Sequence, residues 1–162
     1  MLNMEEDNMK HALAFAFVAA CVGGWASPAV AGGHREQVVA GSLVTEVVPC
    51  SSLCTESEWD GSLDGVSSFT LIWLEDLGIP GANLSRFHGD LVLSTPRGDL
   101  IGQDTGLWNL DTGDYIDIYT VTSGTDDFAG ARGVLILSGK LDPATGHGDS
   151  HYHGVIHPRR QR

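Results

Sequence analysis

The sequence predicts an all-β chain: a closed antiparallel barrel of about eight short strands that follows an N-terminal signal peptide. Short segments rich in branched apolar residues recur at roughly regular spacing. Glycine and proline, 21 and 6 residues respectively, mark the intervals between these segments, and no amphipathic helix of convincing length is present. Strands at such spacing indicate a sandwich or a barrel. Closure is favoured because it hides sheet edges that an exported, glycine-rich chain would otherwise expose.

The composition limits the classes of partner. At 162 residues the chain is expected to form one domain with a sizeable core. It has 9 Lys and Arg against 21 Asp and Glu, a formal net charge of -12. Such a chain is unsuited to nucleic acid, whose phosphates need basic side chains, and to anionic lipid. An uncharged ligand, a cation, a protein partner or a homo-oligomer is compatible with this charge.

The first 31 residues have the three parts of a secretory signal. A basic start at Lys10 is followed by an apolar run over residues 12–22 and by small residues that end at Ala31. We predict cleavage after Ala31 and take Met9 as the true initiator. The alternative, a membrane anchor, is disfavoured because the run is too short to span a bilayer. The mature protein is therefore expected to be secreted or periplasmic, with no membrane association after cleavage.

The cysteines agree with an oxidising compartment. Of the three, Cys21 leaves with the signal, so that Cys50 and Cys54 remain in the motif C-S-S-L-C. We predict a local disulfide between them that pins a turn. The alternatives are a free dithiol or half of a metal site, although no second cysteine pair exists to complete a zinc cage.

The mature chain is expected to have three parts. Residues 32–37 are polar and are predicted to form a flexible N-terminus. Residues 38–157 form the β-barrel domain, and residues 158–162 form a basic tail.

The first half of the barrel domain holds the least regular segments. Residues 38–48 are rich in valine and are predicted to form a strand that Pro49 ends. Residues 51–63 are interpreted as an acidic loop around Trp59 that passes into a short strand. Residues 69–75 are apolar on both faces, as expected of a strand that is central or lines a closed barrel.

Tight turns separate the later strands. The segment T-P-R-G at 95–98 has proline and glycine where a tight turn needs them, so residues 99–110 should pair antiparallel with residues 86–94. D-T-G-D at 111–114 and D-P-A-T-G at 142–146 mark two further turns. The remaining strands are expected at 115–122, 134–138 and 150–156.

The connection at 124–133, G-T-D-D-F-A-G-A-R-G, resembles the GTGxFxxAxG corner of the allene oxide cyclase and dirigent barrels. Residues 137–156 are similar to the ending of small exported bacterial proteins with the same type of barrel. The two matches cover about a quarter of the chain. The resemblance implies an eight-stranded antiparallel barrel with an apolar cavity. Asp126 replaces the second glycine of the corner, and no catalytic residue of the family can be carried over.

One strand carries the candidate catalytic residues. Tyr115, Asp117 and Tyr119 share one face of segment 115–122, and Ile116 and Ile118 share the other. If the first face lines the cavity, a carboxyl group among aromatic rings would have a raised pKa and could act as a general acid or base. If the isoleucines face inward, the three residues lie on the surface. Alternation does not decide between the two, because both faces carry bulky side chains.

Three aromatic residues are candidates for ligand binding. Trp73 and Trp108 lie on strand-like segments and are expected to face the cavity, and Phe128 is the large apolar residue of the corner that can plug inward. Ordinary core packing explains the same residues equally well.

The C-terminal histidines offer a weaker alternative. His151, His153 and His157 share one strand face, and such an H-x-H pattern suits a metal ion. We favour the interpretation in which Tyr152 and Ile156 face inward and the histidines form the solvated outer face. No metal or other cofactor is predicted.

These features favour an exported barrel that binds a small apolar or aromatic molecule in its lumen. Two alternatives stay open. One is an isomerase or cyclase of the allene oxide cyclase kind, or a dirigent-like protein, that shapes a reactive small molecule. The other is a filled barrel with a structural or interaction role.

Overall fold

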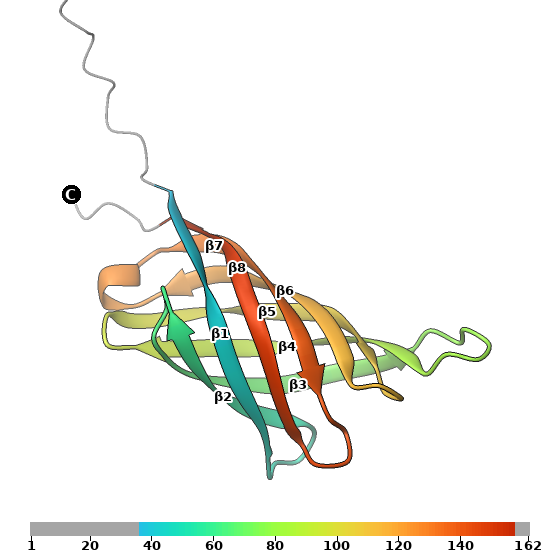
Figure 1. Cartoon of the computed structure of the whole chain (residues 1–162). Coiled ribbons are helices and arrows are strands. Elements are labelled where there is room, and N and C mark those ends of the chain that lie inside the picture. Colours follow the sequence, from blue (N-terminus) through green and yellow to red (C-terminus); the bar gives the residue numbers. More distant parts are fainter. Residues whose placement is uncertain (1–35, 158–162) are drawn as a thin grey trace, which may run out of the picture. The chain divides into compact units, whose positions relative to one another are not determined.

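A computed structural model describes residues 36–157, which form a closed antiparallel barrel of eight strands (Figure 1). Each strand pairs with its neighbour in sequence, and β1 pairs with β8 to close the ring. The strands are β1 (Gln37–Val48), β2 (Cys54–Gly61), β3 (Gly65–Asp76), β4 (Leu84–Thr95), β5 (Gly98–Asn109), β6 (Asp114–Gly124), β7 (Arg132–Leu141) and β8 (His147–His157). The predicted fold class is confirmed. The predicted signal peptide, the Met9 start and the basic tail lie outside the described residues.

Alternation along the strands sorts side chains between the lumen and the outer surface. On β6 the side chains of Asp117, Tyr119 and Val121 are buried and the residues between them are exposed. This settles which face of β6 points inward. The acidic loop expected around Trp59 is instead strand β2, where Trp59 is buried among alternating exposed acids. The sequence does not show an alternation of apolar and polar residues in β2, because the other inward-facing residues, Thr55 and Ser57, are themselves polar.

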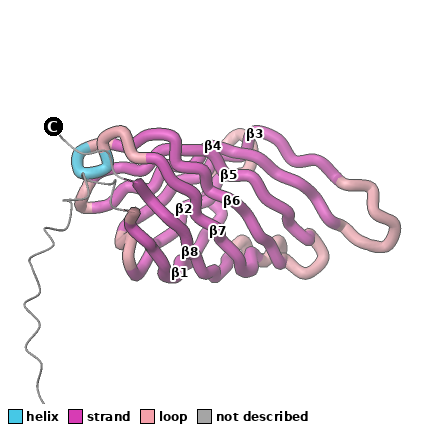
Figure 2. Tube along the Cα trace, turned by 90° about the horizontal axis from the view of Figure 1, so that it is seen from above, coloured by secondary structure: helices cyan, strands magenta, loops and turns pink. Residues whose placement is uncertain are grey.

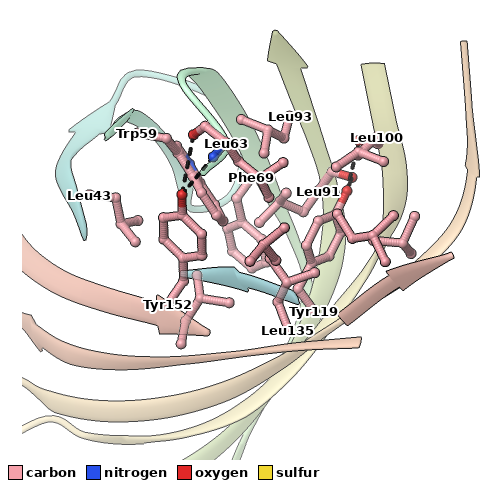
Figure 3. Packing of buried hydrophobic residues seen from close by; sticks show 14 of the residues in the cluster. Leu43, Trp59, Leu63, Phe69, Leu91, Leu93, Leu100, Tyr119, Leu135 and Tyr152 are labelled. Atoms are coloured by element: carbon pink, nitrogen blue, oxygen red, sulfur yellow. Dashed lines mark hydrogen bonds between the residues drawn. The ribbon is translucent and has the colours of Figure 1, made fainter. Parts of the chain in front are cut away.

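One end of the barrel is filled with side chains. Figure 3 shows the buried hydrophobic residues from close by, including Tyr119 and Tyr152 of this end and Trp59 and Phe69 beside it. Two large tyrosines reach across this volume with their hydroxyl groups satisfied by the backbone. The Tyr119 hydroxyl donates to the carbonyl oxygen of Leu100 at 2.7 Å, and the Tyr152 hydroxyl accepts from the N–H of Leu63 at 2.9 Å. Gly41 lies so close to the ring of Tyr152 that a Cβ there would overlap it. Inward glycines thus make room for the large side chains.

The connection between β6 and β7 closes this end. It contains a single-turn 3₁₀ helix, η1 (Asp126–Phe128), in which Asp126 adopts a left-handed conformation with φ of 46°. This region favours glycine, and aspartate tolerates it better than most residues. Phe128 is 1% exposed and points into the filled end, where the guanidinium group of Arg97 lies 4.9 Å from the centre of its ring.

The opposite end, which we call the mouth, carries two distinctive connections. The β3–β4 hairpin extends beyond its neighbours and projects in Figures 1 and 2. The loop between β1 and β2 contains Cys50 and Cys54, whose sulfur atoms lie at disulfide distance, as the sequence predicts. This loop is attached to β3, because the N–H of Leu71 donates to the carbonyl oxygen of Leu53 at 2.9 Å. The disulfide loop therefore forms part of the rim. Among the described residues, no helix has the length and apolar character needed to cross a bilayer.

Replacing Phe128 by alanine tests whether this residue is a structural plug. Removing a fully buried aromatic ring leaves a cavity in the filled end, so we expect the free energy of unfolding to fall by about 3–5 kcal/mol. Urea unfolding monitored by circular dichroism measures this loss. Phe128→Leu, which keeps most of the apolar volume, serves as the control and should cost clearly less. A loss below about 1 kcal/mol for the alanine variant would show that Phe128 does not seal the barrel.

Candidate functional site

The mouth half of the lumen is not filled. It contains a cavity with about 70 Å³ accessible to the centres of water molecules. The lining comes from β1 to β7 and from Leu53 of the disulfide loop. Its apolar residues are Leu43, Leu53, Trp59, Phe69, Leu71, Leu74, Phe87, Leu91, Trp108, Leu137 and Leu141, and its polar residues are Thr45, Thr55, Ser57, Ser67, Asp104, Tyr115 and Asp117.

The structure places Trp73 outside this cavity, which corrects the expectation that it lines the lumen. The pairing of β3 with β4 shifts register between Leu71 and Trp73, which leaves Ile72 as an extra residue in β3. Such a bulge reverses the alternation of the strand beyond it. Leu74 consequently lines the cavity, while Trp73 is 38% exposed and stacks on the outward ring of His88 at 5.6 Å.

Two aspartates on neighbouring strands meet inside the lumen. Asp117 lies on β6 opposite Gly106 of β5, and Asp104 lies two positions along β5 from that glycine, on the same face. Both carboxyl side chains line the cavity, and each residue is 4% exposed. A Cβ at Gly106 would overlap the Cβ of Asp117 and the ring of Phe87. Gly106 therefore gives Asp117 the space to lie against Asp104.

The two carboxyl groups share a proton around neutral pH. Burial raises the pKa of Asp104 to about 7, while hydrogen bonds from Asp117 and from the N–H of Thr105 act in the opposite direction. Burial also raises the pKa of Asp117, well above its ordinary value, and the nearby charge of Asp104 raises it further. When one carboxyl group is protonated it can donate to the other, whereas two ionised groups only accept. Burial therefore favours the protonated form of both carboxyl groups, and Asp104 loses its proton as the pH rises through about 7.

Several polar atoms at the pair are left without partners. Two of the four carboxyl oxygens, the Oδ1 atoms of Asp104 and Asp117, are buried and have no hydrogen-bond partner in the protein. Trp108 lines the same cavity and is 8% exposed, and its indole Nε1 is buried without an acceptor. Leaving a buried polar group unpaired costs about 1–3 kcal/mol each. These atoms are able to bond to a polar group that enters the cavity.

Two tyrosines border the pair on β6. The Tyr115 hydroxyl lies 2.5 Å from the Oγ of Ser150 and lines the cavity. Burial raises the pKa of Tyr115, and the charge of Asp117 raises it further. Burial and the charge of Asp104 raise the pKa of Tyr119 in the same way. Tyr119 lies between the cavity and the filled end, and its hydroxyl donates to the carbonyl oxygen of Leu100. Both phenols stay neutral, so in this cluster Asp104 is the group whose pKa lies near neutral pH, with Asp117 as its hydrogen-bond partner.

The opposite wall of the cavity is polar but neutral. It is formed by β1 to β3, which lie across the ring from β5 and β6. Thr45 Oγ1 and Ser57 Oγ lie 2.9 Å apart, and the indole N–H of Trp59 donates to Ser67 Oγ at 2.8 Å. These hydroxyl groups satisfy one another, in contrast to the carboxyl groups across the lumen. Among the polar residues that line the cavity, the buried atoms without a hydrogen-bond partner therefore belong to Asp104, Asp117 and Trp108.

The remaining predicted site residues lie elsewhere. Phe128 is buried in the filled end and does not line the cavity. His151, His153 and His157 are exposed on the outer face of β8, while Tyr152 and Ile156 point inward, in agreement with the favoured interpretation of that strand. Within residues 36–157, no group of three or more His, Cys, Asp or Glu side chains is arranged to hold a metal ion.

Asp104 is the candidate site residue that the sequence analysis missed. It lies on β5 between Gly102 and Gly106, both of which also point inward. An aspartate flanked by inward glycines does not stand out as a buried position, since none of the three residues is apolar. Its one signal in the sequence is its spacing from Trp108, because residues four apart on a strand share a face.

Comparisons with known proteins do not bear on the site. No family model, no curated protein and no solved structure matches the chain. Barrels of this size host unrelated functions, so the functional inference comes from the side chains of the lumen.

The raised pKa of Asp104 predicts a measurable dependence of stability on pH. Because the folded protein binds this proton more tightly than the unfolded chain does, the contribution of Asp104 is present at low pH and is lost as the pH rises from about 4 to about 7. Asp104→Asn removes the titration. Between pH 5 and pH 8 we therefore expect the free energy of unfolding of the variant to rise relative to wild type by roughly 2–3 kcal/mol.

Urea unfolding of both proteins at the two pH values measures this difference. Asp90→Asn, at an exposed position on β4, is the matched control and should give the same difference from wild type at both pH values. An equally flat result for Asp104→Asn would mean that Asp104 is not buried in the folded protein.

Proposed function

We propose that this protein binds a small, mostly apolar molecule in the mouth half of its barrel. The observation that carries the proposal is the cavity itself, in which an apolar wall surrounds buried polar atoms that the protein leaves unpaired. Ligand sites combine a largely apolar lining with a few polar groups that fix orientation. A barrel that served only as a filled scaffold would have no use for two buried carboxyl groups.

The place of binding is supported by the asymmetry of the lumen. Tyr119 and Tyr152 occupy the filled end with satisfied hydroxyl groups, so a ligand has no room there. Leu53 and Leu74 stand at the mouth, on the disulfide loop and at the base of the β3–β4 hairpin. The ligand enters between these two connections and stops above Tyr119.

An exported location supports the same function. The predicted signal at residues 1–31 and the Cys50–Cys54 disulfide both belong to an oxidising compartment. A carrier outside the cytoplasm meets small apolar molecules directly in the medium.

A second candidate function is acid–base catalysis on the bound molecule. It is favoured by one specific observation, the sharing of a proton between Asp104 and Asp117 inside an apolar cavity. Carboxyl groups whose pKa values are raised toward neutrality can both remove and return a proton. An isomerase or cyclase needs this ability and a shaped pocket, and the resemblance at 124–133 to allene oxide cyclase and dirigent barrels points to the same class.

The binding function predicts that a bulky side chain in the cavity excludes the ligand. Thr55 lines the cavity and its side chain has a free volume to grow into, so Thr55→Phe should abolish retention of a small molecule. Organic extraction of protein purified from its own host, followed by mass spectrometry, measures retention. Thr120→Phe, on the exposed face of β6, is the matched control and should retain the molecule. Wild-type protein without any extractable molecule, and without a response of its tryptophan fluorescence to added 2-phenylethanol, would contradict the proposal.

The catalytic alternative predicts proton exchange at carbon. Incubation of the extracted molecule with wild-type protein in D₂O should introduce deuterium, which mass spectrometry detects. Asp117→Asn should reduce the exchange rate by about 10²-fold or more while retaining the molecule, since general acid–base catalysis contributes about 10²–10⁴-fold. Binding without any exchange in the wild-type protein would leave a carrier and rule out this alternative.

A further inference from the structure

In the described part of the chain, the lumen contains acidic side chains but no basic ones. Above pH 7 the Asp104–Asp117 pair carries one negative charge in an apolar cavity. The lysine and arginine residues of the described chain are all exposed on the outside: Arg86, Arg97, Arg132 and Lys140. No histidine lines the cavity either. A buried charge without a partner is costly, and here the protein supplies no cation to offset it.

Aromatic rings surround the same carboxyl groups. Phe69, Phe87, Trp108 and Tyr115 all line the cavity, and the rings of Phe69 and Phe87 lie edge to face at 6.0 Å. The face of an aromatic ring carries negative electrostatic potential and attracts a cation, most strongly where water is excluded. Rings and a carboxylate in one cavity are the combination that recognises an ammonium group. The Nε1–H of Trp108 is buried in the same cavity without an acceptor, and an acceptor on the body of the ligand, not its ammonium group, would satisfy it.

The four connections around the mouth also carry negative charge. The four connections at the mouth, residues 49–53, 77–83, 110–113 and 142–146, contain no lysine, arginine or histidine, and two of them contain an aspartate, Asp111 or Asp142. The whole chain carries a formal charge of -12. Lys140 lies beside Asp142 and offsets part of the charge of the rim, so it is mainly the net negative charge of the chain that favours the approach of a cation.

We propose that the ligand is a small apolar amine, bound as its cation, with the ammonium group against Asp104 and Asp117 and the apolar body between the aromatic rings. The proposal rests on the proposed binding function and names the chemical class of its ligand. The ammonium group donates to the carboxylate oxygens that have no partner in the protein. It also replaces the missing counter-charge, which neither an alcohol nor a hydrocarbon can do.

The affinity for such a ligand should depend on pH, because the charge of the Asp104–Asp117 pair does. The other titratable groups that point into the lumen are the phenols of Tyr115 and Tyr119 on β6 and Tyr152 on β8, each with a raised pKa, and they remain neutral. The strands β1 to β4 and β7 present apolar or hydroxyl side chains to the cavity. The pair alone therefore gains charge as the pH rises through about 7. Because an alkylamine stays protonated over this range, its affinity should rise with pH.

The experiment compares two probes of nearly equal shape, 2-phenylethylamine and 2-phenylethanol. Titrations followed by tryptophan fluorescence, at pH 8 and pH 5.5 and constant ionic strength, give the dissociation constants. We expect the amine to bind at least about tenfold tighter at pH 8, because a hydrogen bond to a charged group is worth about 1.5–3 kcal/mol. This preference should disappear at pH 5.5. The double variant Asp104→Asn and Asp117→Asn should bring the dissociation constants of the two probes at pH 8 to within about twofold of each other.

The outcomes separate this inference from the proposed function. If the alcohol binds as tightly as the amine at pH 8, the lumen binds apolar molecules and the amine assignment is wrong. If neither probe binds, both the function and the ligand class are overturned. Circular dichroism and urea unfolding show whether the double variant folds, and Asp90→Asn with an unchanged preference controls for general charge removal. If the preference survives in a folded double variant, the amine is recognised elsewhere.

Discussion

The pairing of β1 with β8 is the constraint on which the rest of this structure depends. Once the ring of eight strands is closed, every inward side chain enters one enclosed volume, and a barrel of this size has an interior that side chains just fill. The order of large and small residues along each strand then decides where the interior is solid and where it is hollow. At the filled end, Tyr119 and Tyr152 cross the lumen over inward glycines. At the mouth, hydroxyl residues such as Thr55 and Ser57 are too short to meet the opposite wall.

The same constraint gives the carboxyl pair its chemistry. Alternation on paired strands forces Asp104 and Asp117 onto the inner face, and the glycine between their positions lets the two side chains approach each other. Neither group can reach bulk water or a basic residue, so the protein lowers the cost by retaining a proton. A proton that is held near neutral pH is also a proton that can be moved. The feature that destabilises the barrel is therefore the one that can bind a cation or transfer a proton.

The sequence contained enough information for the fold but only part of the site. Branched apolar strands and proline–glycine turns predicted the later strands closely, since each turn leaves little freedom in the pairing that follows. Asp117 could be named as a candidate, but its direction depended on which face of β6 closed inward, a tertiary property. Trp73 was assigned to the wrong face because a bulge adds one residue and reverses the alternation. Nothing in the run F-T-L-I-W-L marks that position, since every residue after Thr70 is apolar.

The filled end of the lumen supplies packing that stabilises the barrel, and the mouth contains the features that destabilise it. A void and two buried acids each reduce the free energy of unfolding, and a small domain has only about 5–15 kcal/mol in total. Here the losses are confined to the mouth, while the filled end holds the plug Phe128 and two tyrosines bonded to backbone. At the rim, the Cys50–Cys54 disulfide holds the connection that carries Leu53, so the mouth keeps its shape without a packed core beneath it. The binding proposed for the mouth therefore depends on rigidity that the filled end and the rim supply.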